Sequence, residues 1–249
     1  MKIGILGNGS IGCATALSLA EAGHQVLLFG KANREGSASK AAGAMLTALG
    51  EIEDNQLDYE SLKKKFELSY TSVTEYWPKI FSKLYGSKYK KNIFKRGTYI
   101  FTNNFSSPYE YKDFNYIKSL KKYFKKEIFL DKNISNSCPY KLEGIKDSIY
   151  LKDSYVNSQE YLNRLDDYLD KLKVKKVFDF NNYKIEIREK KILLKAKGKS
   201  KKKEIKLDYL IVALGAYSQK LFNENSSIFK KIQKIFFGTG FAFSFFPRD

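Results

Sequence analysis

The sequence predicts an α/β fold built around a parallel β-sheet, and three stretches of its 249 residues carry that prediction. Lys2–Leu6 (KIGIL) is a short apolar run typical of a buried parallel strand, and residues 24–29 (HQVLLF) form a second. A helix lies between them and ends at Gly23. Much later, residues 207–222 (LDYLIVALGAYSQKLF) indicate another buried strand that ends at Gly215 and turns into a short helix.

Glycines follow the first strand in the spacing of a turn that approaches a phosphate. Gly7, Gly9 and Gly12 form G-x-G-x-x-G, where the first glycine allows a tight turn, the second a close backbone approach and the third close helix packing. The helix N-terminus then offers free N–H groups and the positive end of its dipole. Because strand, glycines and a helix face of small residues (Ala16, Ala20) agree, the sequence predicts a Rossmann-type dinucleotide site.

One expected part of that site is missing. An acidic residue normally ends the second strand and accepts hydrogen bonds from the adenosine ribose, whereas this chain has Gly30 followed by Lys31. Two interpretations stay open. The site is degenerate and its affinity reduced, or the ribose is held by backbone or solvent, with Lys31 or Arg34 near the phosphates.

A run of small residues after the second strand, 34–46 (REGSASKAAGAML), indicates the kind of dinucleotide. A plain NAD-binding unit does not need such a run. It suits a segment that passes close under a large flat ligand, where bulky side chains would clash and backbone N–H groups are needed at the ring. The strand and turn at residues 207–222 would close the other side of the same site.

Three motifs in this order, the glycine fingerprint, S-A-S-x-A-A-G-A-M-L and I-V-A-L-G-A-Y-S, resemble those of the FAD-dependent D-amino-acid oxidase superfamily. Glycine oxidase, sarcosine oxidase and the D-amino-acid dehydrogenases are members. Residues 149–165 resemble its strand and Val-Asn turn before a helix, and residues 174–178 (VKKVF) resemble the strand whose backbone lies beside the adenine. The resemblance implies a Rossmann-type FAD-binding domain with a central parallel sheet and β-meander, plus an inserted α+β substrate domain with an antiparallel sheet.

The resemblance also implies a set of FAD-binding residues and a division of the chain. The pyrophosphate would be surrounded by Gly7, Gly9, Ser10, Ile11 and Gly12. The ribityl chain and flavin ring would run along Ser37, Ala38, Ala41, Gly43 and Ala44, with Val177 facing the adenine and Gly215 near the pyrophosphate. Residues 1–50 and 149–228 would form the FAD-binding domain, 51–148 the substrate domain, and 229–249 the start of a truncated return to the substrate domain.

Patterns between the motifs predict further elements. Helical spacing recurs in residues 57–77 and 117–124, and residues 95–102 alternate as a half-buried strand. Trp77, Tyr85 and Tyr99 fit a core better than a pocket. Alternation at residues 184–188, 192–196 and 205–212 predicts a β-meander, and the lysine-rich stretch at 197–203 would be its hairpin tip.

Composition restricts the function classes. The net charge of +18 comes from scattered lysines, which fit a solvated surface better than a nucleic-acid site. Cys13 and Cys138 form no disulfide framework, and the single histidine, His24, leaves no metal-type spacing and fits a surface position. Cys13 fits packing against the sheet. With no signal peptide or membrane span evident, these features predict a reducing, cytoplasmic setting.

The resemblance implies that an amine or amino acid is oxidised by hydride transfer to flavin N5, with oxygen or a respiratory acceptor reoxidising the flavin. No catalytic side chain is assigned. The chain stops at FGTGFAFSFFPRD, before the family's substrate-gripping arginine, so we expect a truncated unit or a site completed by another chain, such as a homo-oligomer partner. A tRNA-modifying flavoprotein of the same superfamily and a non-catalytic Rossmann scaffold are the alternatives.

Overall fold

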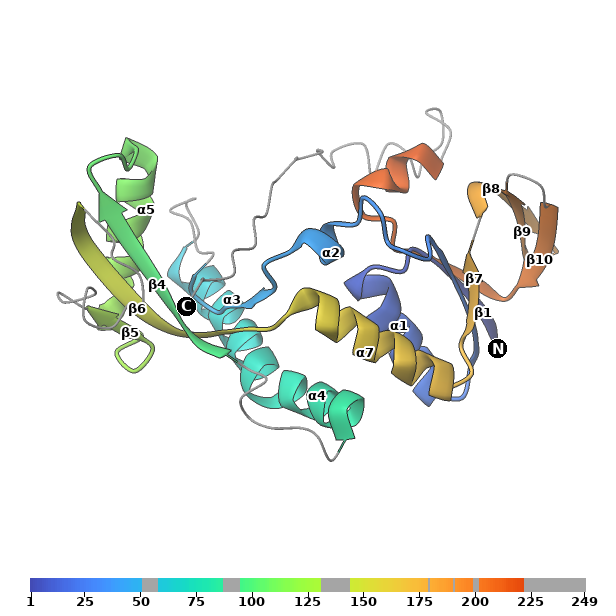
Figure 1. The fold of residues 1–249 in the computed structure, drawn as a ribbon, viewed down its shortest axis with the longest axis horizontal. Helices are drawn as coiled ribbons and strands as arrows, with labels where there is room; N and C mark the ends of the chain where they lie inside the picture. Colours follow the sequence, from blue (N-terminus) through green and yellow to red (C-terminus); the bar gives the residue numbers. More distant parts are fainter. Residues whose placement is uncertain are drawn as a thin grey trace, which may run out of the picture. The chain divides into compact units, whose positions relative to one another are not determined.

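The computed structural model describes residues 1–50, 58–86, 95–130, 144–178, 180–189, 191–198 and 202–221, shown as ribbons in Figure 1. The chain divides into two compact units. Unit 1 combines Met1–Ala42 with Asn157–Asp249, and unit 2 is Gly43–Val156. The predicted return at residues 229–249 and Cys138 lie outside the described residues.

Unit 1 is built on a four-stranded parallel sheet in the order β11-β1-β2-β7. Its strands are β1 (Lys2–Leu6), β2 (Gln25–Gly30), β7 (Lys175–Phe178) and β11 (Tyr209–Val212). The interior strands β1 and β2 are almost entirely buried, which explains why both are continuous apolar runs rather than alternating ones. The register places Leu6 beside Phe29 and Val212, so the carboxyl ends of three strands meet at one edge.

Two helices of unit 1, α1 (Ser10–Glu21) and α7 (Ser158–Lys171), contact each other (Figure 1). Helix α1 buries small residues, including Cys13 and Ala16, which lets it pack closely. Helix α7 starts at Asn157, whose side chain accepts a hydrogen bond from the Glu160 N–H at 2.9 Å. Its buried residues recur at helical spacing: Tyr161, Leu162, Leu165 and Leu169.

A three-stranded antiparallel meander completes the described part of unit 1. Its strands are β8 (Phe180–Arg188), β9 (Lys191–Gly198) and β10 (Lys202–Leu207), in the order β10-β9-β8. One hydrophobic cluster joins this meander to the parallel sheet through Leu6, Leu27, Phe29, Val177, Leu194, Ile205 and Leu207. The expected α/β fold with a parallel sheet and a meander is therefore confirmed.

Two details of the predicted meander were wrong. The expected strand at 205–212 breaks at Asp208, because the Asp208 carboxylate accepts a hydrogen bond from the Lys2 N–H at 2.7 Å and pairs with Lys191. The chain thereby leaves the meander and enters the parallel sheet as β11. The lysine-rich hairpin tip is also shorter than 197–203, since Lys197 already pairs with Lys202 in the ladder between β9 and β10.

Unit 2 combines helices with a second antiparallel sheet. Its helical elements are α3 (Tyr59–Thr71), a π-turn η1 (Ser72–Tyr76), α4 (Trp77–Tyr85), α5 (Pro108–Ser119) and the 3₁₀ turn η4 (Leu120–Lys122). Its strands are β3 (Met45–Leu46), β4 (Lys95–Asn103), β5 (Ile128–Leu130) and β6 (Ile145–Tyr155). The sheet order is β3-β6-β4, with β5 also paired to β6. The inserted α+β part with an antiparallel sheet is thus present as expected.

The sheet pairing extends unit 2 beyond the insert limits of 51 and 148 expected from the sequence. Strand β3 precedes residue 51 and pairs with the end of β6, Met45 opposite Tyr155. Strand β6 runs past residue 148 as one continuous element. The antiparallel sheet therefore draws residues on both sides of the expected insert into unit 2.

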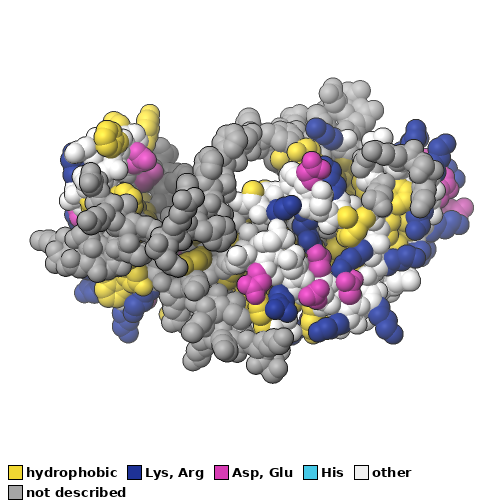
Figure 2. All heavy atoms as spheres, viewed as in Figure 1, with side chains coloured by type: hydrophobic (Ala, Val, Ile, Leu, Met, Phe, Trp, Pro, Cys, Tyr) yellow, Lys and Arg dark blue, Asp and Glu magenta, His cyan; other side chains and the backbone are white. Residues whose placement is uncertain are grey.

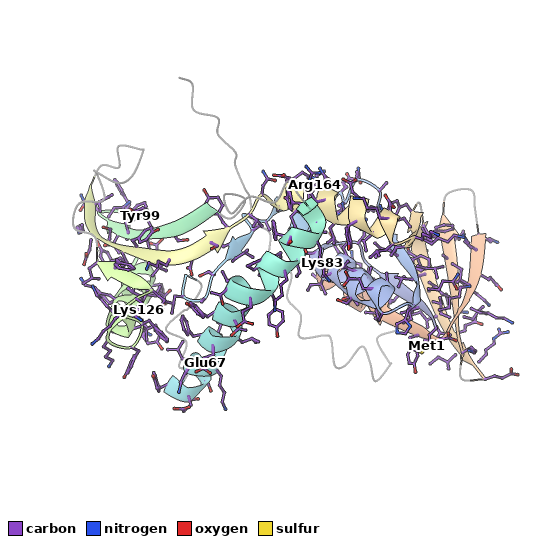
Figure 3. The ribbon with its side chains drawn as sticks, turned by 90° about the horizontal axis from the view of Figure 1, so that it is seen from below. Met1, Glu67, Lys83, Tyr99, Lys126 and Arg164 are labelled. Atoms are coloured by element: carbon purple, nitrogen blue, oxygen red, sulfur yellow. The ribbon has the colours of Figure 1, made fainter. Side chains whose placement is uncertain are left out.

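Aromatic residues of unit 2 pack with one another, as expected for core positions. The Trp77 ring lies 5.6 Å from Phe81, and Tyr85 stacks on Phe81 at 5.4 Å. Tyr99, labelled on β4 in Figure 3, lies 4.9 Å from the ring of Tyr150 on β6. Tyr85 is buried, which supports the core interpretation for this residue, whereas Trp77 and Tyr99 are half-buried.

Candidate functional site: the turn between β1 and α1

The turn after β1 is so tight that two of its glycines are sterically required. Gly7 has a φ of 112°, and a Cβ there would lie 2.2 Å from the carbonyl oxygen of Ala213. A Cβ at Gly12 would lie 1.8 Å from the carbonyl oxygen of Gly7. The first strand, the first helix and the loop after β11 therefore come together through backbone alone, as the fingerprint predicts.

Helix α1 begins at this turn without a side-chain cap. Gly9 is the N-cap residue and supplies no side chain, so the first N–H groups of the helix depend on other partners. The Ser10 N–H donates to the Ser39 Oγ at 3.0 Å, while Ile11 is 76% exposed. The positive end of the helix thus lies at a surface that backbone can approach closely.

The small-residue segment approaches the same turn. The short helix α2 (Ala38–Ala41) follows Ser37, and a Cβ on Gly9 would lie 3.8 Å from the Ser37 Oγ and 3.0 Å from the Ser39 Oγ. On the other side, the loop from β11 leads into the 3₁₀ helix η5 (Gly215–Leu221). Gly215 has a φ of 57° and is exposed. These contacts bring Gly7, Gly9, Ser10, Gly12 and Ser37 into one neighbourhood beside the loop that leads to Gly215.

Four other predicted residues belong to the small-residue segment that follows Ser37. Ala38 and Ala41 are exposed on α2, whereas Gly43 and Ala44 belong to unit 2. The Ala44 carbonyl accepts a hydrogen bond from the Val156 N–H at 3.1 Å.

The remaining predicted residue, Val177, has a buried side chain. It packs in the cluster between the parallel sheet and the meander, and only 4% of the residue is exposed. Strand β7 pairs with β2 and is an edge strand of the parallel sheet. Contact between Val177 and an adenine would therefore involve its backbone.

Arg34 was one of two residues, with Lys31, that one open interpretation placed near the phosphates. In the structure Arg34 is only 5% exposed, and its guanidinium bonds to groups inside unit 1. Nη2 lies 2.6 Å from the Asp166 Oδ1 on α7, and Nε donates to the Asn8 carbonyl oxygen at 2.7 Å. Although burial lowers the pKa of Arg34, its hydrogen bonds to Asp166 and Cys13 outweigh burial and raise that pKa above its ordinary value.

Cys13 packs beneath the turn, as expected. Its thiol is fully buried, donates to the Asn8 carbonyl oxygen at 3.2 Å and lies 3.6 Å from the Arg34 Nη2. Burial raises the pKa of Cys13 despite the nearby guanidinium, so the thiol is held in its unreactive protonated form. Burial likewise raises the pKa of Tyr161, on α7, to about 12. We therefore assign structural rather than catalytic roles to Cys13 and Tyr161.

Two residues at the turn were missed by the sequence analysis, Ser39 and Asn8. The hydroxyls of the small-residue run were recognised, but the spacing could not show which serine reaches Ser10. Asn8 occupies a variable position of the fingerprint. A Cβ on Gly30 would lie 2.2 Å from the Asn8 Oδ1 and 2.3 Å from its Cγ, which explains the glycine at the end of β2.

Two other features are absent from the described residues. No helix there is both long and apolar enough to cross a membrane. Likewise, no three His, Cys, Asp or Glu side chains of the described part gather in a way that could hold a metal ion.

Comparison with solved structures gives the same fold. Glycine oxidase from Geobacillus kaustophilus matches with a TM-score of 0.70 at 18% identity, covering 88% of this chain and 56% of that one. Glycine oxidase from Bacillus cereus matches at 0.66 and 21%, with the same coverage. L-Proline dehydrogenase from P. horikoshii matches at 0.64 and 18%, covering 88% and 54%. The chain therefore spans about half the length of these structures.

No curated protein sequence matches the chain. The model of one protein family does match, and it covers residues 2–248. That family is described as DAO, FAD-dependent oxidoreductase. Because the match includes both units, the chain belongs to the DAO family of FAD-dependent oxidoreductases.

Proposed function

We propose that unit 1 binds FAD at the turn between β1 and α1 and that the protein oxidises an amine or amino acid. FAD is the cofactor of the family. The observation that carries the proposal is the turn itself, where Gly7 and Gly12 leave no room for a Cβ and α1 starts without a side-chain cap. Such an arrangement fits a pyrophosphate, because the positive end of the helix dipole favours an anion and the glycines let it approach the backbone, although the Ser10 N–H already donates to Ser39.

The chain's own residues would divide the work of holding the cofactor. The N–H groups at the start of α1 would bind the pyrophosphate, and Ser37 and Ser39 would add hydroxyls beside it. Ser39 already accepts a hydrogen bond from Ser10 and so fixes the small-residue segment to the turn. Bound FAD would supply the redox chemistry by accepting a hydride at flavin N5 from the carbon beside the substrate nitrogen, leaving an imine that water hydrolyses.

The proposed substrate class rests on the family and on its structural neighbours. Matching structures are named glycine oxidase, iminodiacetate oxidase and L-proline dehydrogenase. All of these names denote oxidation of an amino acid or a related amine. We infer the same class for this protein, with unit 2 contributing to the substrate site and oxygen or a respiratory carrier accepting the electrons.

The tRNA-modifying alternative has weaker support in the charge distribution. Figure 2 shows Lys and Arg side chains gathered over the meander, with acidic side chains among them. Lys184 and Lys195 pair with Glu186 at 3.5 and 2.7 Å, and Lys191 pairs with Asp208. Lysines that already have carboxylate partners neutralise phosphates less effectively, so a nucleic-acid substrate is not favoured.

The visible absorption spectrum of the full chain, recorded after incubation with FAD and removal of the excess, tests the proposal. We expect a flavin double band that bleaches without oxygen when glycine, sarcosine, a D-amino acid or L-proline is added. A bound flavin that none of these substrates bleaches would contradict the amino-acid assignment but not the FAD site. The absence of bound flavin would refute the FAD site and favour the scaffold alternative.

A pair of variants on α1 assigns the flavin to the turn. Gly12→Val places atoms against the Gly7 carbonyl and should abolish the flavin band. Ser18 is an exposed residue further along the same helix, so Ser18→Ala removes only a local hydrogen bond to the Ala14 carbonyl and should leave the band unchanged. Equal flavin content in the two variants would place the cofactor elsewhere.

A further inference from the structure

The Asn8 side chain occupies the place where a side chain at position 30 would start. Its Oδ1, Cγ and Cβ lie 2.2, 2.3 and 2.9 Å from the Cβ position of Gly30. Position 30 ends β2, where an acidic residue normally accepts a hydrogen bond from the adenosine ribose. A polar side chain from the neighbouring turn therefore stands where that acid would begin.

The Asn8 carboxamide bonds to the protein through its nitrogen, and its oxygen has no partner among the described residues. Its Nδ2 donates to the Lys31 carbonyl oxygen at 2.8 Å, and this bond fixes which end of the amide faces Gly30. Among the described residues no donor bonds to the Asn8 Oδ1, although the residue is only 7% exposed. This oxygen is not among the buried side-chain atoms that lack a partner, so it is open to solvent and can accept a hydrogen bond from a ligand.

Hydrogen bonds to its backbone carbonyl hold Asn8 in place. Its carbonyl oxygen accepts hydrogen bonds from the Arg34 Nε at 2.7 Å and from the Cys13 thiol at 3.2 Å. Arg34 is itself paired with Asp166. The carboxamide is held by its own Nδ2 bond to the Lys31 carbonyl, on a backbone held by Arg34 and Cys13, so its oxygen loses little conformational entropy when it binds a hydroxyl.

We propose that Asn8 replaces the missing acid and that its carboxamide oxygen accepts a hydrogen bond from a hydroxyl of the FAD adenosine ribose. The inference rests on the proposed FAD site. A carboxamide oxygen accepts a hydrogen bond as a carboxylate does, but it carries no charge, so it binds the hydroxyl more weakly. In this arrangement Asn8 accepts the hydrogen bond from the ribose that an acidic residue at position 30 would otherwise accept.

The test compares the dissociation constants of FAD and of an FAD analogue whose adenosine ribose lacks its 2′- and 3′-hydroxyls, measured by isothermal titration calorimetry. We expect the wild-type chain to prefer FAD by about threefold to tenfold, as for one neutral hydrogen bond. Asn8→Ala should weaken FAD binding by a similar factor and remove the preference. Asn33→Ala should keep it, because that exposed side chain bonds only to the nearby Glu35 N–H.

A double variant tests the exchange directly and does not depend on how well Asn8→Ala folds. Asn8→Gly with Gly30→Glu removes the carboxamide that would collide with a side chain at position 30 and returns the acid to the end of β2. Because a charged acceptor forms a stronger hydrogen bond, its preference for FAD should exceed about tenfold. Gly30→Glu alone, in which Asn8 still fills the space, should bind FAD less tightly than the double variant.

The outcomes separate this inference from the proposed function. A wild-type chain that binds FAD without any preference for the ribose hydroxyls, or Asn8→Ala protein that keeps the preference, would overturn the role of Asn8 while leaving the FAD site intact. A double variant with no preference would also overturn it. A wild-type chain that binds neither ligand would refute the FAD site, and the ribose contact with it.

Discussion

Removing the charge of Asp166 should destabilise the protein by much more than removing that of its neighbour Asp170. Asp166 pairs with the buried Arg34 at 2.6 Å, so Asp166→Asn leaves a guanidinium that is 5% exposed without its counter-charge. Loss of one partner from a buried pair costs about 3–5 kcal/mol. Because Asp166 is 25% exposed and Arg34 keeps its bond to Asn8, we expect about 2–3 kcal/mol.

The matched control lies on the same helix and shares a lysine with Asp166. Lys176 contacts Asp166 at 4.0 Å and Asp170 at 2.7 Å, but Asp170 is 61% exposed. Asp170→Asn therefore breaks a solvent-screened pair and should cost less than about 0.5 kcal/mol. The two substitutions are chemically identical, so any difference between them reflects Arg34 and its burial.

Urea unfolding followed by far-UV circular dichroism measures both free energies. With a slope of about 2 kcal/mol per molar urea, Asp166→Asn should lower the midpoint by about 1–1.5 M, and Asp170→Asn by less than about 0.3 M. The FAD concentration must be equal in all samples, because bound ligand shifts the midpoint. Equal midpoints for the two variants would show that the Arg34 pair contributes no more than a surface ion pair.

Three further predictions concern hydrogen bonding, reactivity and pH. The Thr102 Oγ1 is buried and has no partner among the described residues, so Thr102→Val should be neutral or stabilise the protein by up to about 1 kcal/mol. Thr47→Val removes bonds to Asp153 and Gly50 and should cost about 1–3 kcal/mol. Equal melting-temperature shifts for the two variants would contradict this. With Cys138 replaced by serine, the Cys13 thiol should react with a disulfide reagent at least about 100-fold more slowly in folded than in urea-unfolded protein, because it is buried and its pKa raised. Hydrogen bonds from Lys195 and Arg188 lower the pKa of Glu186 from 4.5 to about 2, so the stabilisation from Glu186 is complete above about pH 4.5 and is lost as the pH falls towards 2. The melting-temperature difference between wild type and Glu186→Gln should therefore shrink between neutral pH and about pH 3.5. A constant difference would refute the assignment.

The sequence revealed those parts of the fold that depend on neighbouring residues. Gly7, Gly9 and Gly12 carry their own spacing, and the apolar runs of β1 and β2 lie on either side of them, so strand, turn and helix could be predicted together. The alternation of β9 likewise follows from residues within one strand. In each case the pattern and the structure that it produces lie within a short stretch of chain.

Contacts between distant residues could not be predicted in this way. Arg34 is charged and follows β2, so a phosphate was a reasonable expectation, but its partner Asp166 lies 132 positions away. Asp208 breaks the expected strand because it reaches Lys2, 206 positions earlier. The Asn8 carboxamide fills the space that a side chain at position 30 would occupy. The spacing of residues in the sequence does not show that two such distant positions compete for the same space.

These distant contacts imply that the turn between β1 and α1 depends on both segments of unit 1. The turn is formed by residues 7–12, but the loop after β11 closes on Gly7, and the Ala213 N–H donates to the Leu6 carbonyl at 2.7 Å. Helix α7 holds Arg34, and Arg34 holds the carbonyl of Asn8. Since α7 and β11 both follow unit 2 in the sequence, the contacts that hold the turn come from chain on both sides of unit 2.

This dependence separates two ways in which FAD binding can be weakened. Asp166→Asn acts through Arg34 and should loosen the Asn8 carbonyl while leaving the carboxamide acceptor chemically intact. Asn8→Ala removes the acceptor and leaves the pair of Arg34 and Asp166 in place. Weaker binding in the first variant should therefore retain the preference for ribose hydroxyls, whereas weaker binding in the second should lose it, so the two measurements together distinguish a residue that positions the site from one that contacts the cofactor.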